Sequence, residues 1–331
     1  MNKTVSVVLP VYNGMPYVKK AIDSVLAQSY PALELIVIDD GSRDDTPRLL
    51  AGYGDRIVTK RFDNAGVATA MSRGLEMARG DYVAFMDHDD VWFKDKLKRQ
   101  MEAVIARPEA QFVCTDYAVR PPGMNGRLLK HFSKLRVLRD AAFDGPVLKN
   151  SLKGLLRENF VGTSTSVLVS RDVTRKVGFF NPSYKITGDY DYWLRCGLFT
   201  DFIVLREVLF YKRTHQTNIS ANQAPMLKEH LCILDEFMKK NRTRLKELGA
   251  EEDCRRGISV VRYQLGNIRF SDKKPGEAYS LYFRAWAIWP TASNTATFLY
   301  TFLKKSVRLA TFGILSRKSF EKIPGMFRRG T

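Results

Sequence analysis

The sequence lacks the features that mark several common classes of protein, beginning with cysteine. Only four of its 331 residues are cysteine, and they lie far apart without any CxxC pair. Cysteines spaced in this way make neither a zinc site nor the disulfide framework of a small secreted domain. We therefore expect a protein of the reducing cytoplasm.

Long hydrophobic runs are also missing. No run of about 18 apolar residues, the length that a membrane-spanning helix needs, occurs in the chain. The N-terminal stretch MNKTVSVVLPVYNG is interrupted by Pro10, Asn13 and Gly14 too early for a signal peptide. The chain is therefore not expected to span a bilayer.

Acidic residues are few relative to basic ones. Lysine and arginine number 53 and aspartate and glutamate 35, and residues 221–331 alone hold 21 basic and 10 acidic side chains. A positive surplus favours a polyanionic partner: nucleic acid, an anionic membrane face or a phosphorylated substrate. The sequence offers no zinc finger, aromatic RNP pattern or recognition-helix motif, so we expect no nucleic-acid partner.

The apolar residues present, 45% of the chain, suffice for a packed core, and their spacing predicts its fold class. Apolar positions three and four apart predict helices at 18–26 and 67–78. This alternation predicts a mainly parallel α/β sheet with right-handed crossovers, followed from about residue 221 by helices. Short, β-rich apolar stretches predict the strands at 5–12, 33–40, 56–62, 82–87 and 111–117.

Polar residues follow the first four predicted strands, in the stretches PVYN, DDGSRDDT, DNAG and DHDD. Ligands of parallel sheets bind beyond the carboxyl ends of the strands, so all four stretches are expected at one edge. Asp39, beside Asp40 and the flexible Gly41, can accept hydrogen bonds from a nucleobase or a ribose. The alternative is an Asx-turn that starts a helix at Asp44 or Thr46.

The fourth stretch places Asp87, His88, Asp89 and Asp90 directly after a buried strand. Like charges crowded there cost energy unless a cation lies among them. Asp87 and Asp89, in Asp-x-Asp spacing, can hold Mg²⁺ or Mn²⁺ together with substrate phosphates. In the alternative, Asp89 or Asp90 caps the helix that follows.

Together these motifs resemble family 2 glycosyltransferases of the bacterial surface-polysaccharide type. The resemblance covers roughly residues 4–117 and, more weakly, 160–220. It implies the GT-A fold, a Rossmann-like mixed, mainly parallel sheet flanked by helices, for a catalytic domain at 1–220. It also implies transfer of a sugar from a UDP- or dTDP-linked donor to a hydroxyl of a glycan or lipid-linked glycan, helped by Mn²⁺ or Mg²⁺.

The resemblance assigns roles to matching residues. Family members often carry Ala-Arg-Asn where this chain has Ala70, Met71 and Ser72, so a possible base or phosphate contact is missing. His88, between two key carboxylates, is expected to face the donor rather than the metal. The positions implied for the base and ribose are Pro10, Tyr12 and Asp39, and those for the metal and diphosphate are Asp87 and Asp89.

The stretch TGDYDYWLR resembles the family's Glu-Asp motif, with Gly188 where glutamate is frequent. An inverting transfer needs a carboxylate that removes the proton of the acceptor hydroxyl. We expect Asp189 to be this base and keep Asp191 as the alternative, because residues two apart on a helix point in different directions. The purely structural alternative is that Asp189 caps the helix.

Two further segments can each be interpreted in a functional or a purely structural way. His215, in YKRTHQTNIS, matches the family's basic-x-His segment and is a candidate third metal ligand, or an ordinary loop histidine. The loop GTSTS at 162–166 either lines the acceptor side of the site or is only a turn. The alternative to an enzyme is a protein of the same fold that binds a nucleotide sugar but does not catalyse its transfer.

The region 221–331 mixes aromatic, aliphatic and basic residues, and 301–331 holds 8 basic side chains and 1 acidic. This composition favours helices lying on an anionic membrane surface, at the inner face of the membrane. The alternative is a helical subdomain packed on the core, or one repeat of a tetratricopeptide kind, which could not bury its own face alone.

Overall fold

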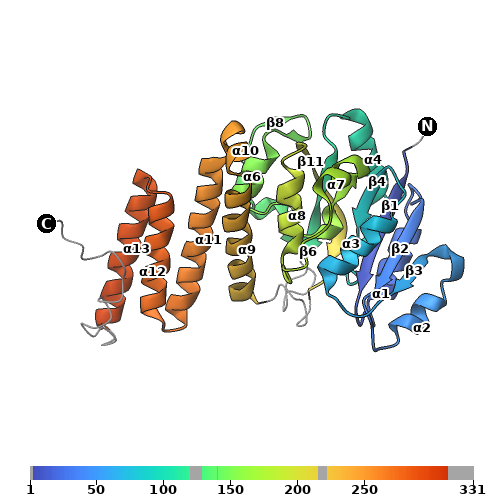
Figure 1. The fold of residues 1–331 in the computed structure, drawn as a ribbon, viewed down its shortest axis with the longest axis horizontal. Coiled ribbons are helices and arrows are strands. Elements are labelled where there is room, and N and C mark those ends of the chain that lie inside the picture. Colours follow the sequence, from blue (N-terminus) through green and yellow to red (C-terminus); the bar gives the residue numbers. More distant parts are fainter. Residues whose placement is uncertain (1–2, 120–128, 140, 215–221, 312–331) are drawn as a thin grey trace. The chain divides into compact units, whose positions relative to one another are not determined.

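The computed structural model describes residues 3–119, 129–139, 141–214 and 222–311. The chain forms two compact units, Met1–Ala221 and Asn222–Thr331, each with its own packing. Figure 1 shows the first as a sheet with helices on both faces and the second as helices alone.

Eleven strands of the described residues join in one sheet, in the order β3-β2-β1-β4-β10-β6-β11-β9-β8, with β5 paired to β11 and β7 to β6. Strand β10 runs antiparallel to β4 and β6, whereas β3, β2, β1, β4, β6 and β11 point the same way. The predicted mixed, mainly parallel sheet is therefore confirmed. The strands are β1 (Val5–Val11), β2 (Glu34–Asp39), β3 (Val58–Arg61), β4 (Tyr82–Phe85), β5 (Val91–Trp92), β6 (Phe112–Val119), β7 (Leu129–Lys130), β8 (Phe143–Asp144), β9 (Val147–Leu148), β10 (Leu168–Ser170) and β11 (Phe202–Lys212).

Helices cover both faces of this sheet, as its apolar strands require. On one face α1, α2 and α4 share a core cluster with Val7 and Leu9 of β1. On the other, α3 packs on β1 and β2, and Trp193 of α8 lies 5.7 and 5.4 Å from the rings of Phe85 and Phe112. The helices are α1 (Val18–Leu26), α2 (Thr46–Ala51), α3 (Val67–Met77), α4 (Lys96–Ala106), α5 (Arg136–Arg139), α6 (Ser151–Arg157), α7 (Arg171–Val177) and α8 (Gly188–Cys196).

One local prediction was wrong. The helix after the acidic stretch begins at Lys96, so neither Asp89 nor Asp90 caps it, because Val91–Trp92 instead pairs with β11. Further along the chain, β10 starts at Leu168 after a 3₁₀ turn at Ser164–Ser166, and α6 starts at Ser151 after β9.

The second unit consists of helices in which α11 packs against both α9 and α12, and α12 against α13. Gly266 allows α11 and α12 to approach closely, since a Cβ there would lie 2.4 Å from the ring of Tyr282. No helix of the described chain has both the length and the apolar character that crossing a membrane requires. The helices are α9 (Gln223–Lys240), α10 (Arg242–Glu247), α11 (Glu251–Ser271), α12 (Pro275–Ile288) and α13 (Ala292–Thr311).

Candidate active site

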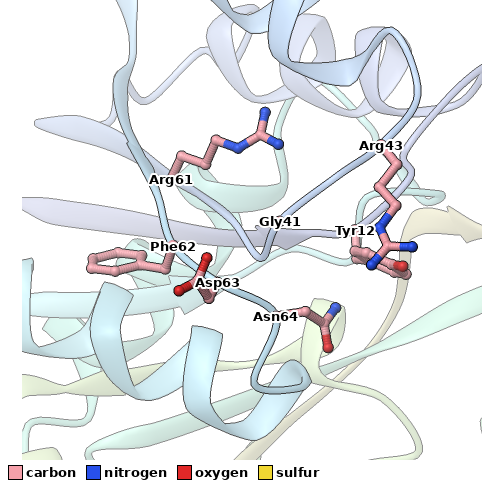
Figure 2. A pocket seen from close by; sticks show the side chains of 7 residues that line it. All are labelled: Tyr12, Gly41, Arg43, Arg61, Phe62, Asp63 and Asn64. Carbon is pink, nitrogen blue, oxygen red and sulfur yellow. The ribbon is translucent and has the colours of Figure 1, made fainter.

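A pocket of about 820 Å³ opens at the carboxyl ends of β1, β2 and β3, where the sequence placed its polar stretches. We call it the strand-end pocket; Figure 2 shows the side chains around it. Gly41 lines the pocket and has a positive φ of +82°. A Cβ at this position would lie 3.0 Å from the backbone nitrogen of Asn64. The pocket is lined by Tyr12, Gly41, Arg43, Arg61, Phe62, Asp63 and Asn64.

Asp39 is held beside this pocket by its own turn. Its side chain is 1% exposed, and Oδ1 accepts a hydrogen bond from the backbone N–H of Ser42 at 2.8 Å. Its Oδ2 is buried and accepts no hydrogen bond from the described residues, although Nη1 of Arg61 lies 3.5 Å away. A buried carboxylate oxygen in this state can accept a hydrogen bond from a ligand N–H or O–H.

Asp40 has a structural task, which the sequence did not reveal. Its two oxygens accept hydrogen bonds from the backbone N–H groups of Ala65 and Gly66, at 3.0 and 2.8 Å. Arg73 lies 3.6 Å from the same carboxylate and 4.2 Å above the ring of Phe62. Asp40 thus fixes the loop that carries the pocket residues after β3.

The acidic loop, Asp87–Asp90, follows β4 and is held by the hydroxyl loop 162–166. Oδ1 of Asp87 accepts a hydrogen bond from Oγ of Ser164 at 2.7 Å, and Oδ2 from Oγ1 of Thr163 at 2.8 Å. The backbone N–H of Asp87 donates to Oγ1 of Thr165 at 3.0 Å. The GTSTS stretch therefore positions the Asp87 side chain. The expectation that this stretch also lines the acceptor side of the site stays a prediction.

Acidic side chains are concentrated in this loop. Burial, followed by the charges of Asp87 and Asp89, raises the pKa of Asp90 to about 8 against the opposing effect of Lys212. Oδ1 of Asp90 accepts a hydrogen bond from the backbone N–H of Arg213 at 3.1 Å. A further positive charge at this place would be stabilised by the loop.

The donor atoms of the acidic loop fit a hard divalent cation. They are carboxylate oxygens, which Mg²⁺ and Mn²⁺ prefer. No three or more acidic, histidine or cysteine side chains of the described residues are arranged as a metal cage. The loop therefore fits a cation that takes one or two protein carboxylates, such as Asp87 and Asp89, and completes its shell with diphosphate oxygens and water.

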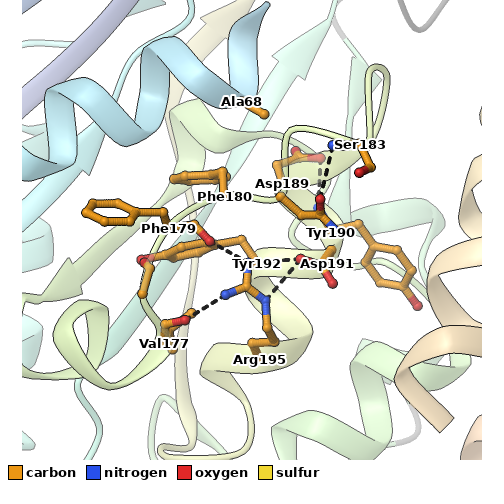
Figure 3. A network of polar contacts seen from close by, with 12 residues as sticks. Ala68, Val177, Phe179, Phe180, Ser183, Asp189, Tyr190, Asp191, Tyr192 and Arg195 are labelled. Atoms are coloured by element: carbon orange, nitrogen blue, oxygen red, sulfur yellow. Dashed lines mark hydrogen bonds and ion pairs between the residues drawn. The ribbon is translucent and has the colours of Figure 1, made fainter. Parts of the chain in front are cut away.

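The two carboxylates of α8 have different surroundings, as Figure 3 shows. Asp191 forms an ion pair with Arg195 at 2.9 Å, and that guanidinium also donates to the carbonyls of Val177 and Phe179. Asp189 accepts a hydrogen bond from the N–H of Tyr190. Burial, and next the charge of Asp87, raises the pKa of Asp189 to about 6. Asp189 therefore lies within electrostatic reach of the acidic loop.

The remaining predicted positions lie as follows. Pro10 is buried within β1, paired with Ile38, and Tyr12 lines the strand-end pocket. His88 is half-buried in the turn of the acidic loop. His215 lies outside the described residues, so its role as a third ligand stays a prediction.

Several residues of the site were missed at the level of sequence. Arg43 and Arg61 line the strand-end pocket, and Lys212 lies against the acidic loop. In the sequence, the features that could have pointed to these residues were the polar stretch after β3 and the run of hydroxyl residues at 162–166. Nothing in the local pattern shows which surface arginine or lysine the fold brings to a site. Met71, where relatives of the predicted family often have arginine, is a buried core residue of α3.

A mixed α/β sheet with a pocket and an acidic loop at one edge is the architecture of the GT-A fold class, and solved glycosyltransferase structures match it. Residues 1–349 of S. aureus TarS, in complex with UDP-GlcNAc, match with a TM-score of 0.59 and 17% identity, over 91% of this chain and 92% of that one. The mannosyltransferase PcManGT of Pyrobaculum calidifontis, in complex with GDP-Man and Mn²⁺, matches with a TM-score of 0.58 and 18% identity, over 97% and 83%. At these identities the likeness shows the fold.

The chain belongs to glycosyl transferase family 2, whose family model matches residues 6–178, more than half of the sequence. A relative is the putative teichuronic acid biosynthesis glycosyltransferase TuaG of Bacillus subtilis (strain 168). It is 35% identical over 194 residues, which make up 57% of this chain and 70% of that protein. The family resemblance read from the sequence is confirmed.

Proposed function

We propose that this glycosyltransferase is an inverting, metal-dependent enzyme that moves a hexosyl or deoxyhexosyl group from a UDP- or dTDP-linked donor to a glycan or lipid-linked glycan hydroxyl. One observation carries the proposal. Asp189 and Asp87, from α8 and from the end of β4, lie close enough for the charge of Asp87 to raise the pKa of Asp189. A base would thus stand within electrostatic reach of the carboxylate proposed to hold the metal that stabilises the departing diphosphate.

In this proposal the strand-end pocket takes the nucleoside. Oδ2 of Asp39 would accept a hydrogen bond from a nucleobase N–H or a ribose hydroxyl, the ring of Tyr12 would contact the base, and Arg61 would donate to a base carbonyl. UDP-GlcNAc and GDP-Man in the structural neighbours support a nucleoside diphosphate sugar as the donor. The name of TuaG supports a polysaccharide acceptor.

The chemical step needs few protein groups. Asp189 would remove the proton of the acceptor hydroxyl as its oxygen bonds to the anomeric carbon, and the bond to the diphosphate would break on the opposite face. Mn²⁺ or Mg²⁺, when bound at Asp87 and Asp89, supplies charge that stabilises the leaving diphosphate. Thr163 and Ser164 keep the Asp87 carboxylate in place throughout.

The test is a panel of sugar nucleotides, with and without Mn²⁺. Thermal shift identifies the donor that stabilises the protein, and transfer to glycan acceptors is then followed by NMR of the new anomeric centre. Inversion at that carbon supports the proposal. Donor binding without transfer to any acceptor would favour the rival reading, a sugar-nucleotide-binding protein without turnover.

We also propose that the enzyme works at the inner face of the membrane and meets it through α13. Several aromatic residues of the described helices pack against one another, as Trp286 does on Phe298 at 5.6 Å and Tyr279 on Phe302 at 5.1 Å, so the proposed membrane contact rests on other side chains. Among the described side chains of α13, the large hydrophobic ones that are exposed are Leu299, Tyr300 and Leu303, at 52%, 64% and 62%. This helix contains no acidic residue, which suits anionic headgroups.

Replacing both Leu299 and Leu303 by serine should weaken binding to vesicles containing phosphatidylglycerol by about ten-fold or more, because two exposed leucines lose their apolar contact. Co-sedimentation measures this. The matched control is Ile105→Ser, which removes an equally exposed apolar side chain from α4 of the other unit. Equal vesicle binding by the double variant and the wild type would rule out this face as the membrane contact.

A further inference from the structure

Lys212, the last residue of β11, lies against the acidic loop and the hydroxyl loop. Its Nζ donates a hydrogen bond to Oγ1 of Thr163 at 3.2 Å and lies 4.0 Å from Oδ2 of Asp87. The same threonine hydroxyl donates to that carboxylate oxygen at 2.8 Å. Lys212, Thr163 and Asp87 therefore form one connected chain of polar contacts, and the lysine side chain is only 23% exposed.

The ammonium group is charged in this position. A lysine amine is ordinarily protonated at neutral pH, and Oδ2 of Asp87, 4.0 Å from Nζ, favours the charged form. The fold thus places the positive charge of Lys212 next to the Asp87 carboxylate of the acidic loop.

The neighbouring Arg213 has other partners. Its Nε donates to the backbone carbonyl of Asp89 at 3.2 Å, and its guanidinium lies 4.8 Å from the ring centroid of Tyr17. Lys212 is therefore the cationic side chain that this strand end directs at the Asp87 carboxylate.

We infer that Lys212 is the internal counter-ion of the acidic loop, an inference that rests on the proposed metal-dependent transfer. In the donor-free protein the ammonium offsets the carboxylates, and it repels a divalent cation that enters alone. A nucleoside diphosphate brings negative charge that offsets both the cation and the ammonium. The cation consequently binds well only together with the diphosphate.

The direct test uses Mn²⁺ alone, titrated into the full-length chain and followed by electron paramagnetic resonance. Lys212→Met should bind Mn²⁺ about ten-fold or more tightly than the wild type, because the positive charge 4.0 Å from Oδ2 of Asp87 has been removed. Lys212→Arg retains the charge and should bind Mn²⁺ as weakly as the wild type. Lys98→Met, which removes one exposed charge from α4, is the control and should change nothing.

A second neutral variant, Lys212→Gln, can still donate a hydrogen bond to Thr163 and covers the case in which the methionine variant does not fold. Unchanged or weaker Mn²⁺ binding by a folded neutral variant would overturn the inference. So would wild-type protein that binds Mn²⁺ equally tightly with and without UDP. Sugar transfer by the wild type alongside either result would leave the proposed function intact, since the Mn²⁺ titration involves no turnover.

Discussion

Replacing Asp189 by asparagine should reduce the rate of sugar transfer by roughly 10²-fold or more while leaving donor affinity near the wild-type value. The expected loss is that of a general base, because the amide cannot take the proton of the acceptor hydroxyl. The side chain keeps its size and can still accept the hydrogen bond from the N–H of Tyr190. Transfer kinetics and donor titration, measured on the same preparation, separate the two quantities.

The matched control is Asp191→Asn, which changes the neighbouring carboxylate of the same helix. It breaks the ion pair with Arg195, so the free energy of unfolding should fall by about 1.5–3 kcal/mol, the range for a hydrogen bond to a charged group. Transfer by the folded variant should largely persist. Normal transfer by Asp189→Asn together with inactive, folded Asp191→Asn would move the base to Asp191.

The pH profile gives the same assignment an independent check. A base must be ionised to act, and burial together with the charge of Asp87 raises the pKa of Asp189 to about 6. Hence kcat/KM should fall as the pH drops below about 6 and level off above it. A bound divalent cation stabilises the ionised form of Asp189, so the fall in kcat/KM then occurs at a lower pH. A profile in which activity increases on acidification would contradict the assignment.

Replacing Asp87 or Asp89 by asparagine should weaken the Mn²⁺-dependent part of donor binding by about 10- to 100-fold, because an amide is a poor ligand for a hard cation and carries no charge. Donor affinity is measured with Mn²⁺ and with EDTA, and the ratio of the two values is the quantity to compare. In EDTA the variants should differ little from the wild type.

The control for this pair is Asp144→Asn, which removes an exposed carboxylate that pairs with Arg107 at 2.6 Å. Its Mn²⁺-dependent donor affinity should equal that of the wild type. Full retention of the Mn²⁺ effect in both Asp87→Asn and Asp89→Asn would remove the metal from these residues and with it the central part of the proposed mechanism.

Much of the fold could be predicted because its signals are local. The spacing of apolar residues alone predicts β1, β2, β4 and α1. The predicted bounds of these elements agree with the observed bounds to within a few residues. Errors arose where pairing over a long sequence distance overrides local pattern. Val91–Trp92 reads as the start of a helix, but it pairs with Phe210–Tyr211 and becomes a strand.

The candidate site can be divided in the same way. The sequence predicted that Asp39, Asp87 and Asp89 lie at one edge of the sheet, because each follows a strand pattern and the ends of parallel strands share an edge. Their roles in binding stay predictions. The sequence left Asp189 and Asp191 as alternatives, since spacing along a helix does not say which side chain has a partner. Arg195 pairs with Asp191, and Asp87 lies near Asp189, only in the folded chain.

The family, the main strands and helices of the first 117 residues and the acidic stretch after β4 follow from the sequence alone. The hydrogen bonds from the hydroxyls of 162–166 to Asp87, and the positions of Arg61 and Lys212 beside acidic side chains, exist only in the folded chain. This division arises because periodicity and turn chemistry depend on neighbouring residues. The partner of a charged side chain depends on which distant strand ends the sheet brings to one edge.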